Sequence, residues 1–143
     1  MKSKNIAVLI TSTFVIIATG LAAQAATFTL SPKGQELLFD KTTLKAKKGE
    51  KIKLTFKNTA GMQHNWVLVA PGTAEKVAMA GITAGADKGW LPTTPDVLAH
   101  TKLVEPKQSD TIEFVAPSTP GEYPYICSFP GHASTMHGVL IVK

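Results

Sequence analysis

The chain has 143 residues, of which 15 are basic and 10 acidic, and its formal net charge is +5. Every basic residue is a lysine, so the guanidinium fork that reads phosphates and base edges is missing, and this composition argues against nucleic-acid binding. The single cysteine, Cys127, excludes a disulfide within the chain.

The first 25 residues have the pattern of a cleaved secretory signal peptide. Two lysines precede an apolar run over 6–23, and small residues, Ala23 and Ala25, occupy the two positions that a signal peptidase recognises. We therefore predict cleavage after Ala25 and export to the periplasm. An uncleaved membrane anchor is the alternative, because about 18 apolar residues approach the length that spans a bilayer.

Residues 26–143 are predicted to form one domain, because a chain of this size can bury an apolar core of its own. Loss of the two lysines in the signal peptide leaves a net charge of about +3, which would favour encounters with an acidic partner. We expect the mature protein to be a monomer that does not span a membrane.

The mature sequence consists of strand-like segments separated by turn residues. Over 51–57 the apolar Ile52, Leu54 and Phe56 alternate with polar residues, as in a strand with one buried face. Other strands are predicted at 37–46, as a partner of 51–57, and at 64–70, 110–116, 121–129 and 138–143. Short strands at this spacing indicate an all-β Greek-key sandwich.

The segment 71–96 interrupts this pattern. It is rich in alanine and glycine, has few large apolar residues, and contains Pro92 and Pro95 near its end. We predict a flap outside the sandwich, with a short helical turn at 74–81. Trp90, within the flap, is interpreted as either a lid or a local anchor.

The stretch CSFPGHASTMHG, residues 127–138, holds the chemically distinctive side chains. An exported free thiol risks oxidation unless something occupies it, and thiolate, imidazole and thioether are the ligands that copper prefers. Cys127, His132 and Met136 offer one of each, and the turn at 130–131 lets them converge. His64, which opens a buried strand, is the best candidate for a fourth ligand. An inert buried cysteine and a zinc site are the alternatives.

These motifs resemble those of the cupredoxin family, in particular the bacterial blue copper proteins azurin and auracyanin. CSFPGHASTM is similar to their copper loop, and HNWVLV, residues 64–69, is similar to the strand that carries their first histidine. The stretches VLAHTKLV (97–104) and SDTIEF (109–114) extend the resemblance over most of the mature chain. Unlike azurin, the sequence lacks an N-terminal disulfide, and its flap is shorter.

The resemblance implies one copper ion per chain and assigns its ligands. His64, Cys127 and His132 would form a trigonal plane, with Met136 as a weak axial ligand. Around them, Asn65 would link the two ligand loops, and the backbone N–H groups of Asn65 and Phe129 would point at the Cys127 sulfur, whereas Pro130 has no N–H to offer. Gln63 replaces an azurin glycine and is left out of the ligand set, and His100 and His137 are expected to be non-ligands.

The same resemblance implies a function. Met62, Phe129 and Pro130 are expected to form an apolar collar around an exposed edge of His132, where redox partners would dock transiently. The chain would then be a one-electron carrier and not an enzyme, because copper enzymes of this kind need a second copper centre and no spare histidine cluster exists. A copper storage or delivery protein of cupredoxin fold is the alternative.

Overall fold

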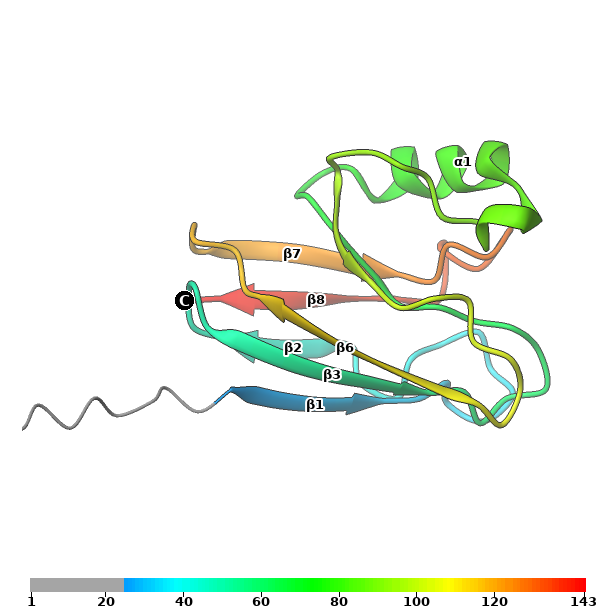
Figure 1. The fold of residues 1–143 in the computed structure, drawn as a ribbon, viewed down its shortest axis with the longest axis horizontal. Helices are drawn as coiled ribbons and strands as arrows, with labels where there is room; N and C mark the ends of the chain where they lie inside the picture. Colours follow the sequence, from blue (N-terminus) through cyan, green and yellow to red (C-terminus); the bar gives the residue numbers. More distant parts are fainter. Residues whose placement is uncertain (1–24) are drawn as a thin grey trace, which may run out of the picture.

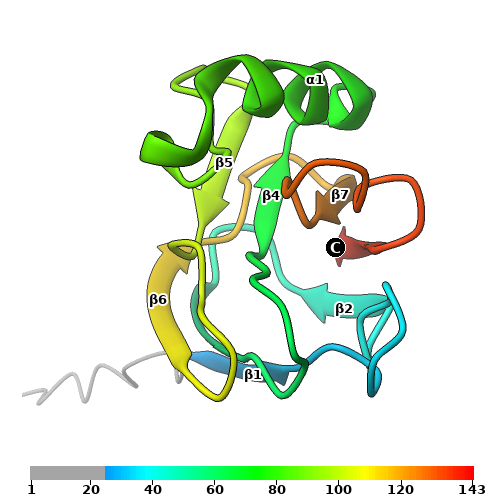
Figure 2. The same cartoon turned by 90° about the vertical axis from the view of Figure 1, so that its right-hand side faces the viewer.

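A computed structural model describes residues 25–143, so the predicted signal peptide, apart from its last residue, lies outside the described residues. Two sheets face each other as a sandwich (Figures 1 and 2). The smaller sheet has the strand order β1 (Ala26–Leu30), β3 (Lys51–Lys57), β6 (Ser109–Val115). The larger has the order β2 (Thr43–Ala46), β8 (His137–Val142), β7 (Gly121–Ile126), β4 (Val67–Val69), β5 (Val97–His100). The predicted all-β sandwich is confirmed.

The smaller sheet is organised around β3. Its Ile52, Leu54 and Phe56 are at most 1% exposed, as the alternating pattern predicts, and its lysines face solvent. β6 pairs with β3 in antiparallel register, whereas β1 pairs with it in parallel. The predicted partnership of 37–46 with 51–57 is wrong, because only Thr43–Ala46 form a strand there, and this strand pairs in parallel with β8 of the larger sheet.

The core between the sheets extends up to the distinctive stretch near the C-terminus. Tyr123, Tyr125 and Cys127 share one face of β7 and its extension, and all are buried. Trp66 packs against Tyr125 and is fully buried, as expected. The Tyr125 hydroxyl donates a hydrogen bond to the Lys41 carbonyl at 2.7 Å, so the phenol body is buried while its polar end is satisfied.

The flap contains more helix than the sequence predicted. Helix α1 (Ala74–Ala84) and the short 3-10 helix Ala86–Lys88 lie outside the sandwich, over the larger sheet (Figures 1 and 2). Val77 is buried in a small second core that β4 and Ile126 complete. Within residues 25–143, no helix combines the length and the hydropathy needed to cross a bilayer.

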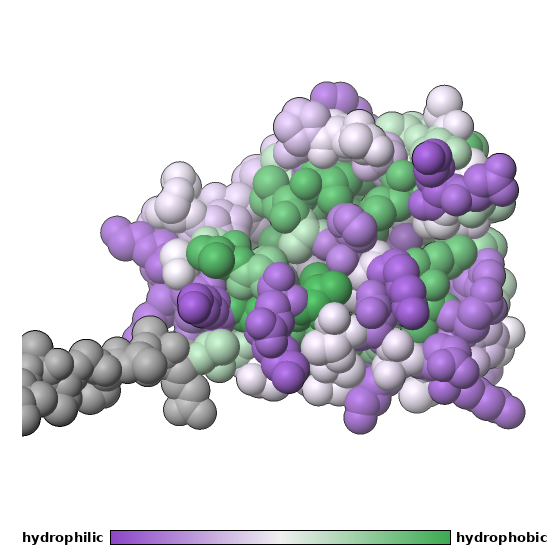
Figure 3. Space-filling model, in the orientation of Figure 1, coloured by the Kyte–Doolittle hydropathy of each residue, from purple (hydrophilic) through white to green (hydrophobic). Residues whose placement is uncertain are grey.

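The two ends of the molecule carry different parts of the chain. The loop 127–136 lies at the end where α1 covers the sheet, while the start of β1 and the C-terminus lie at the opposite end (Figure 1). Figure 3 shows hydrophobic residues in the centre of the face viewed in Figure 1 and hydrophilic residues along its lower edge. The start of β1 and the C-terminus are therefore remote from the loop that carries the candidate ligands.

Candidate metal centre

Three predicted ligands converge in the structure. One donor atom from each of His64, Cys127 and His132 lies within 4.8 Å of the other two. The Cys127 sulfur is 3.8 Å from His64 Nδ1 and 3.5 Å from His132 Nδ1. Their exposed fractions are 1%, 0% and 4%, so all three donors are screened from water. Residues more than sixty positions apart thus form one small polar cluster in an apolar environment.

His64 is fixed by its backbone before β4 begins. Its N–H donates to the Val104 carbonyl at 3.2 Å, and the Val104 N–H donates back at 2.8 Å, which makes an isolated antiparallel bridge. The buried Asn58 reinforces this region, because its Nδ2 donates to the carbonyls of Val104 and Met62 at 2.8 and 2.7 Å. The His64 ring therefore projects from a rigid backbone even though the residue lies outside a regular strand.

The other candidate ligands lie on the loop that joins β7 to β8. Gly131 takes a left-handed conformation, with φ of 80°, which turns the chain back after Pro130. The Cys127 N–H donates to the Met136 carbonyl at 3.0 Å, and the Met136 N–H donates to the His132 carbonyl at 2.7 Å. Met136 is fully buried in the same apolar cluster as Cys127. The loop thus folds onto itself with its sulfur and imidazole side chains directed inward.

Asn65 connects the two segments through its side chain. Its Oδ1 accepts a hydrogen bond from the Ser128 N–H at 2.8 Å, and its Nδ2 donates to the Ser128 hydroxyl at 2.8 Å. Ser128 was not singled out from the sequence, although a polar side chain directly after the cysteine was a usable signal. Because both bonds are buried, they tie the neighbour of His64 firmly to the neighbour of Cys127.

Burial sets the protonation of the cluster. It lowers the pKa of His64 to about 4, with a smaller effect from the His132 charge, and it also lowers the pKa of His132. Burial raises the pKa of the Cys127 thiol to about 11, although the predicted hydrogen bonds from the backbone N–H groups of Asn65 and Phe129 oppose that rise. At neutral pH the metal-free site therefore holds two neutral imidazoles, which have lone pairs free for a metal, and one protonated thiol.

These groups fit a soft metal such as copper. Two imidazoles, a thiol and a nearby thioether are the donors that copper electron-transfer sites use, and a structural zinc site is usually richer in cysteine. Binding of a metal ion would place a positive charge beside the buried Cys127 sulfur and so stabilise its thiolate form. The donor chemistry and the burial thus agree with the ligand set inferred from the sequence.

The remaining predicted residues have mixed outcomes. His100 and His137 are exposed and lie outside the cluster. Met62 is 44% exposed, and Pro130 is half-buried. The expected exposed edge of His132 is wrong, because only 4% of the residue is accessible. The Phe129 ring packs against the His132 ring, with centroids 4.6 Å apart and 33° between the planes.

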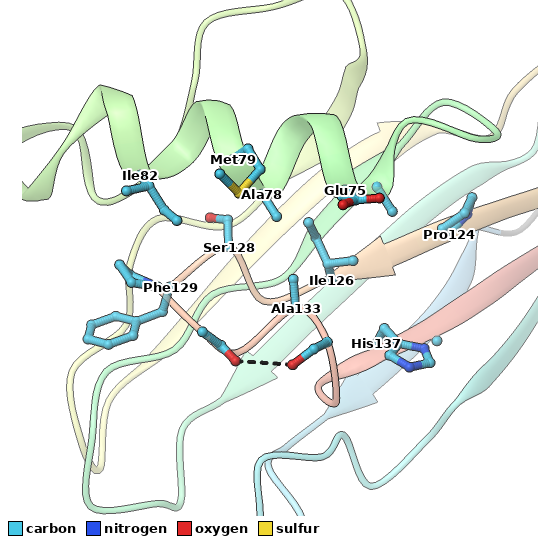
Figure 4. Close-up of a pocket in the computed structure, with 15 residues that line it drawn as sticks. Glu75, Ala78, Met79, Ile82, Pro124, Ile126, Ser128, Phe129, Ala133 and His137 are labelled. Atoms are coloured by element: carbon cyan, nitrogen blue, oxygen red, sulfur yellow. Dashed lines mark hydrogen bonds between the residues drawn. The ribbon is translucent and has the colours of Figure 1, made fainter.

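A groove of 540 Å³ separates the loop from helix α1 (Figure 4). Met79 and Ile82 on the helix face Phe129 and Ala133 on the loop across this groove. Its lining is mainly apolar, and Met79 and Ile82 are 60% and 46% exposed. The sequence placed few apolar residues in the flap and did not predict that two of them would lie beside the loop.

A family model and individual copper proteins match this chain. A family model described as copper binding proteins, plastocyanin/azurin family, matches residues 26–143. Auracyanin-A of Chloroflexus aurantiacus is 39% identical over 121 residues, which cover 82% of this chain and 74% of auracyanin-A. An azurin of Pseudomonas chlororaphis is 42% identical over 85 residues, which cover 57% of this chain and 66% of the azurin.

Solved structures agree with the sequence matches. Auracyanin A of C. aurantiacus, described as a "blue" copper protein, superposes with a TM-score of 0.79 at 38% identity, covering 84% of this chain and all of auracyanin A. The dithionite-reduced auracyanin of Roseiflexus castenholzii superposes with a TM-score of 0.78 at 36% identity, covering 83% of this chain and 98% of that auracyanin. The chain therefore belongs to the plastocyanin/azurin family, and it is a blue copper cupredoxin.

Proposed function

We propose that the protein is an exported one-electron carrier that holds one copper ion through His64, Cys127 and His132, with Met136 as a weak fourth ligand. The observation that carries this proposal is the convergence of two neutral imidazoles and one thiol within 4.8 Å in a buried pocket. The family to which the chain belongs consists of copper proteins that carry electrons between redox partners.

The bound copper would supply a centre that gains and loses one electron. The task of the protein is to keep its donors in place while the charge changes. His64 is held by the Val104 bridge, and the Asn65–Ser128 bonds join it to the loop of Cys127. Ligands held in this way need little rearrangement when the electron count changes, and their burial keeps water from becoming an additional ligand.

The surroundings of Cys127 would tune the site. The backbone N–H groups of Asn65 and Phe129 oppose the rise in the pKa of its thiol, and in the loaded protein they would withdraw charge from the sulfur. Pro130, which follows Phe129, has no N–H, so it cannot add a further donor. We propose that these two donors stabilise the thiolate form in the loaded protein and help to set the reduction potential.

We propose that the protein has no enzymatic activity of its own. Within residues 25–143, His64, Cys127 and His132 make up the one group of at least three metal-binding side chains. The chain neighbours of Cys127 are Ile126 and Ser128, so no histidine beside the cysteine could connect it to a second copper centre. Carriage of an electron between partners needs only the single site.

The docking surface is proposed to include Met62, Pro130 and the outer edge of His132. Met62 and Pro130 are accessible, and Pro130 also lines the apolar groove beside α1. A small apolar contact suits a transient encounter, in which partners must separate quickly after the transfer. We further propose that the mature protein acts as a monomer in the periplasm, after removal of residues 1–25.

The copper-loaded protein tests the proposal directly. Oxidised protein with one Cu(II) per chain should show an intense blue thiolate-to-copper absorption band, and Cys127→Ser should abolish it while His100→Gln leaves it unchanged. A wild-type Cu(II) complex without this band would refute the proposal. Persistence of the band in Cys127→Ser would show that the ligand set is wrong.

A second measurement separates electron carriage from storage or delivery. A delivery protein must release its metal, whereas His64, Cys127 and His132 are almost fully buried. We therefore expect copper to transfer slowly to a competing chelator and the reduced protein to exchange electrons rapidly with an oxidised small redox protein. Fast copper release combined with slow electron exchange would favour the delivery function instead.

A further inference from the structure

His132 is more enclosed than its position on a surface loop suggests. It is 4% exposed, while the preceding Gly131 and the nearby Ser134 and Thr135 are exposed. Its Nδ1 faces the Cys127 sulfur, so Nε2 is the ring nitrogen directed away from the cluster. Something other than the loop backbone must therefore cover the outer part of the ring.

Phe129 provides the first part of this cover. Its ring centroid lies 4.6 Å from that of His132, with 33° between the ring planes, which is a partly stacked arrangement. Phe129 is itself only half-buried, so it needs support to stay over the imidazole.

Trp90, from the flap, provides that support. Its ring meets the Phe129 ring edge-on, with centroids 5.9 Å apart and planes at 69°. This is a favourable geometry for two aromatic rings, because the positive edge of one meets the negative face of the other. Trp90, Phe129 and His132 thus form a continuous row from the flap to the metal centre.

The flap backbone holds Trp90 in an unusual conformation. Trp90 has φ of 58°, which a bulky residue seldom adopts. Its N–H donates to the Gly85 carbonyl at 3.0 Å, and a Cβ on Gly81 would lie 2.5 Å from the Trp90 carbonyl oxygen, so only glycine permits this approach. Asn65 Nδ2 also lies 3.4 Å from the Gly89 carbonyl, which joins the flap to the segment that bears His64. A strained residue kept in place by several contacts indicates a local role.

We propose that Trp90 is a positioning residue of the metal centre: it holds Phe129 over His132, and so fixes the imidazole orientation and keeps water from its outer nitrogen. This rests on the proposed function to the extent that His132 is a ligand. The flap then contributes directly to the metal site. The sequence left Trp90 as either a lid or a local anchor, and its contact with Phe129 favours the lid.

The test uses the zinc(II)-loaded protein, which is diamagnetic, and NMR exchange of the histidine ring N–H groups with water. In Trp90→Ala we expect the His132 Nε2–H to exchange roughly two- to tenfold faster, the change that corresponds to the loss of one aromatic pair. His64 should be unaffected. Trp90→Phe should restore slow exchange, and Met79→Ala, a change of an exposed flap residue, should have no effect.

Equal exchange in wild type and Trp90→Ala would overturn the proposal, as would an equal acceleration in Met79→Ala or a failure of Trp90→Phe to restore protection. If Trp90→Ala does not fold, Gly81→Ala takes its place, because the added Cβ pushes against the Trp90 carbonyl while it keeps the indole. Accelerated His132 exchange in that variant supports the proposal, and unchanged exchange refutes it.

The ligand assignment is tested separately in the same samples. Zinc binding to wild-type protein should shift the ring resonances of both His64 and His132. If the His132 resonances do not move, the proposed function fails at that residue whatever the Trp90 variants show. If they move but the Trp90 variants behave as wild type, only the positioning role fails.

Discussion

Acid should destabilise the metal-free protein through His64. Its pKa falls from 6.5 to about 4 in the folded protein because the ring is buried. Between these two pH values the unfolded chain binds a proton that the folded chain does not, so folding stability falls as the pH falls. Each pH unit costs about 1.4 kcal/mol, which gives a total loss of about 3 kcal/mol once the pH is below 4. A loss of this size is a large part of a stability that is typically about 5–15 kcal/mol.

Urea unfolding of the metal-free protein at several pH values between 7 and 4 measures this effect. Carboxylates also titrate in the lower part of the range, so the informative quantity is the difference between wild type and His64→Gln. Between pH 7 and pH 4, the free energy of unfolding of His64→Gln should fall by about 3 kcal/mol less than that of the wild type. His100→Gln, a change of an exposed histidine, should follow wild type. If wild type and His64→Gln decline in parallel, His64 is not buried as a neutral ring and the reasoning is refuted.

Three further predictions concern the neighbours of the site. Gly138→Ala should lower stability by about 1–3 kcal/mol in thermal unfolding, because the added Cβ would overlap the Tyr125 ring. Gly121→Ala is the control and should have a smaller effect, because the nearest atom would be 3.7 Å from its Cβ. Equal effects of the two substitutions would contradict the overlap. Asn65→Ala removes two buried hydrogen bonds to the metal loop and should lower the free energy of unfolding in urea by about 2–4 kcal/mol. A decrease below about 0.5 kcal/mol would mean that these bonds are dispensable. At pH 7, zinc(II) binding should release one proton from the Cys127 thiol, measured in weakly buffered solution, and absence of release would show that the thiol does not bind.

The sequence predicted local structure well because local patterns carry it. The alternation of Ile52, Leu54 and Phe56 identified a one-sided strand, and the spacing of Cys127 and His132 within a turn identified the metal loop. Both are properties of neighbouring residues, whose side chains fall on predictable faces of a strand or converge across a short turn.

Long-range pairing was harder to predict. The sequence of residues 43–46 does not specify β8 as the partner of β2. Parallel pairing of strands far apart in the sequence depends on the packing of the whole sheet. The same limit applies to the metal centre. The cover over His132 comes from Trp90, in a segment whose helix was underestimated and whose backbone takes a conformation that tryptophan rarely adopts. Composition alone identified that segment as a flap but could not show what it touches.

The position of β8 also determines when the complete metal site is assembled. β8 lies between β2 and β7, so the larger sheet has a gap until residues 137–142 are in place. The preceding loop, which carries Cys127, His132 and Met136, is tethered on one side by this strand. The structure therefore assembles the buried arrangement, with His64 against the loop, only once this strand is in the sheet. An unfolded chain still carries three of the donors close together in sequence, but not the complete, water-screened site.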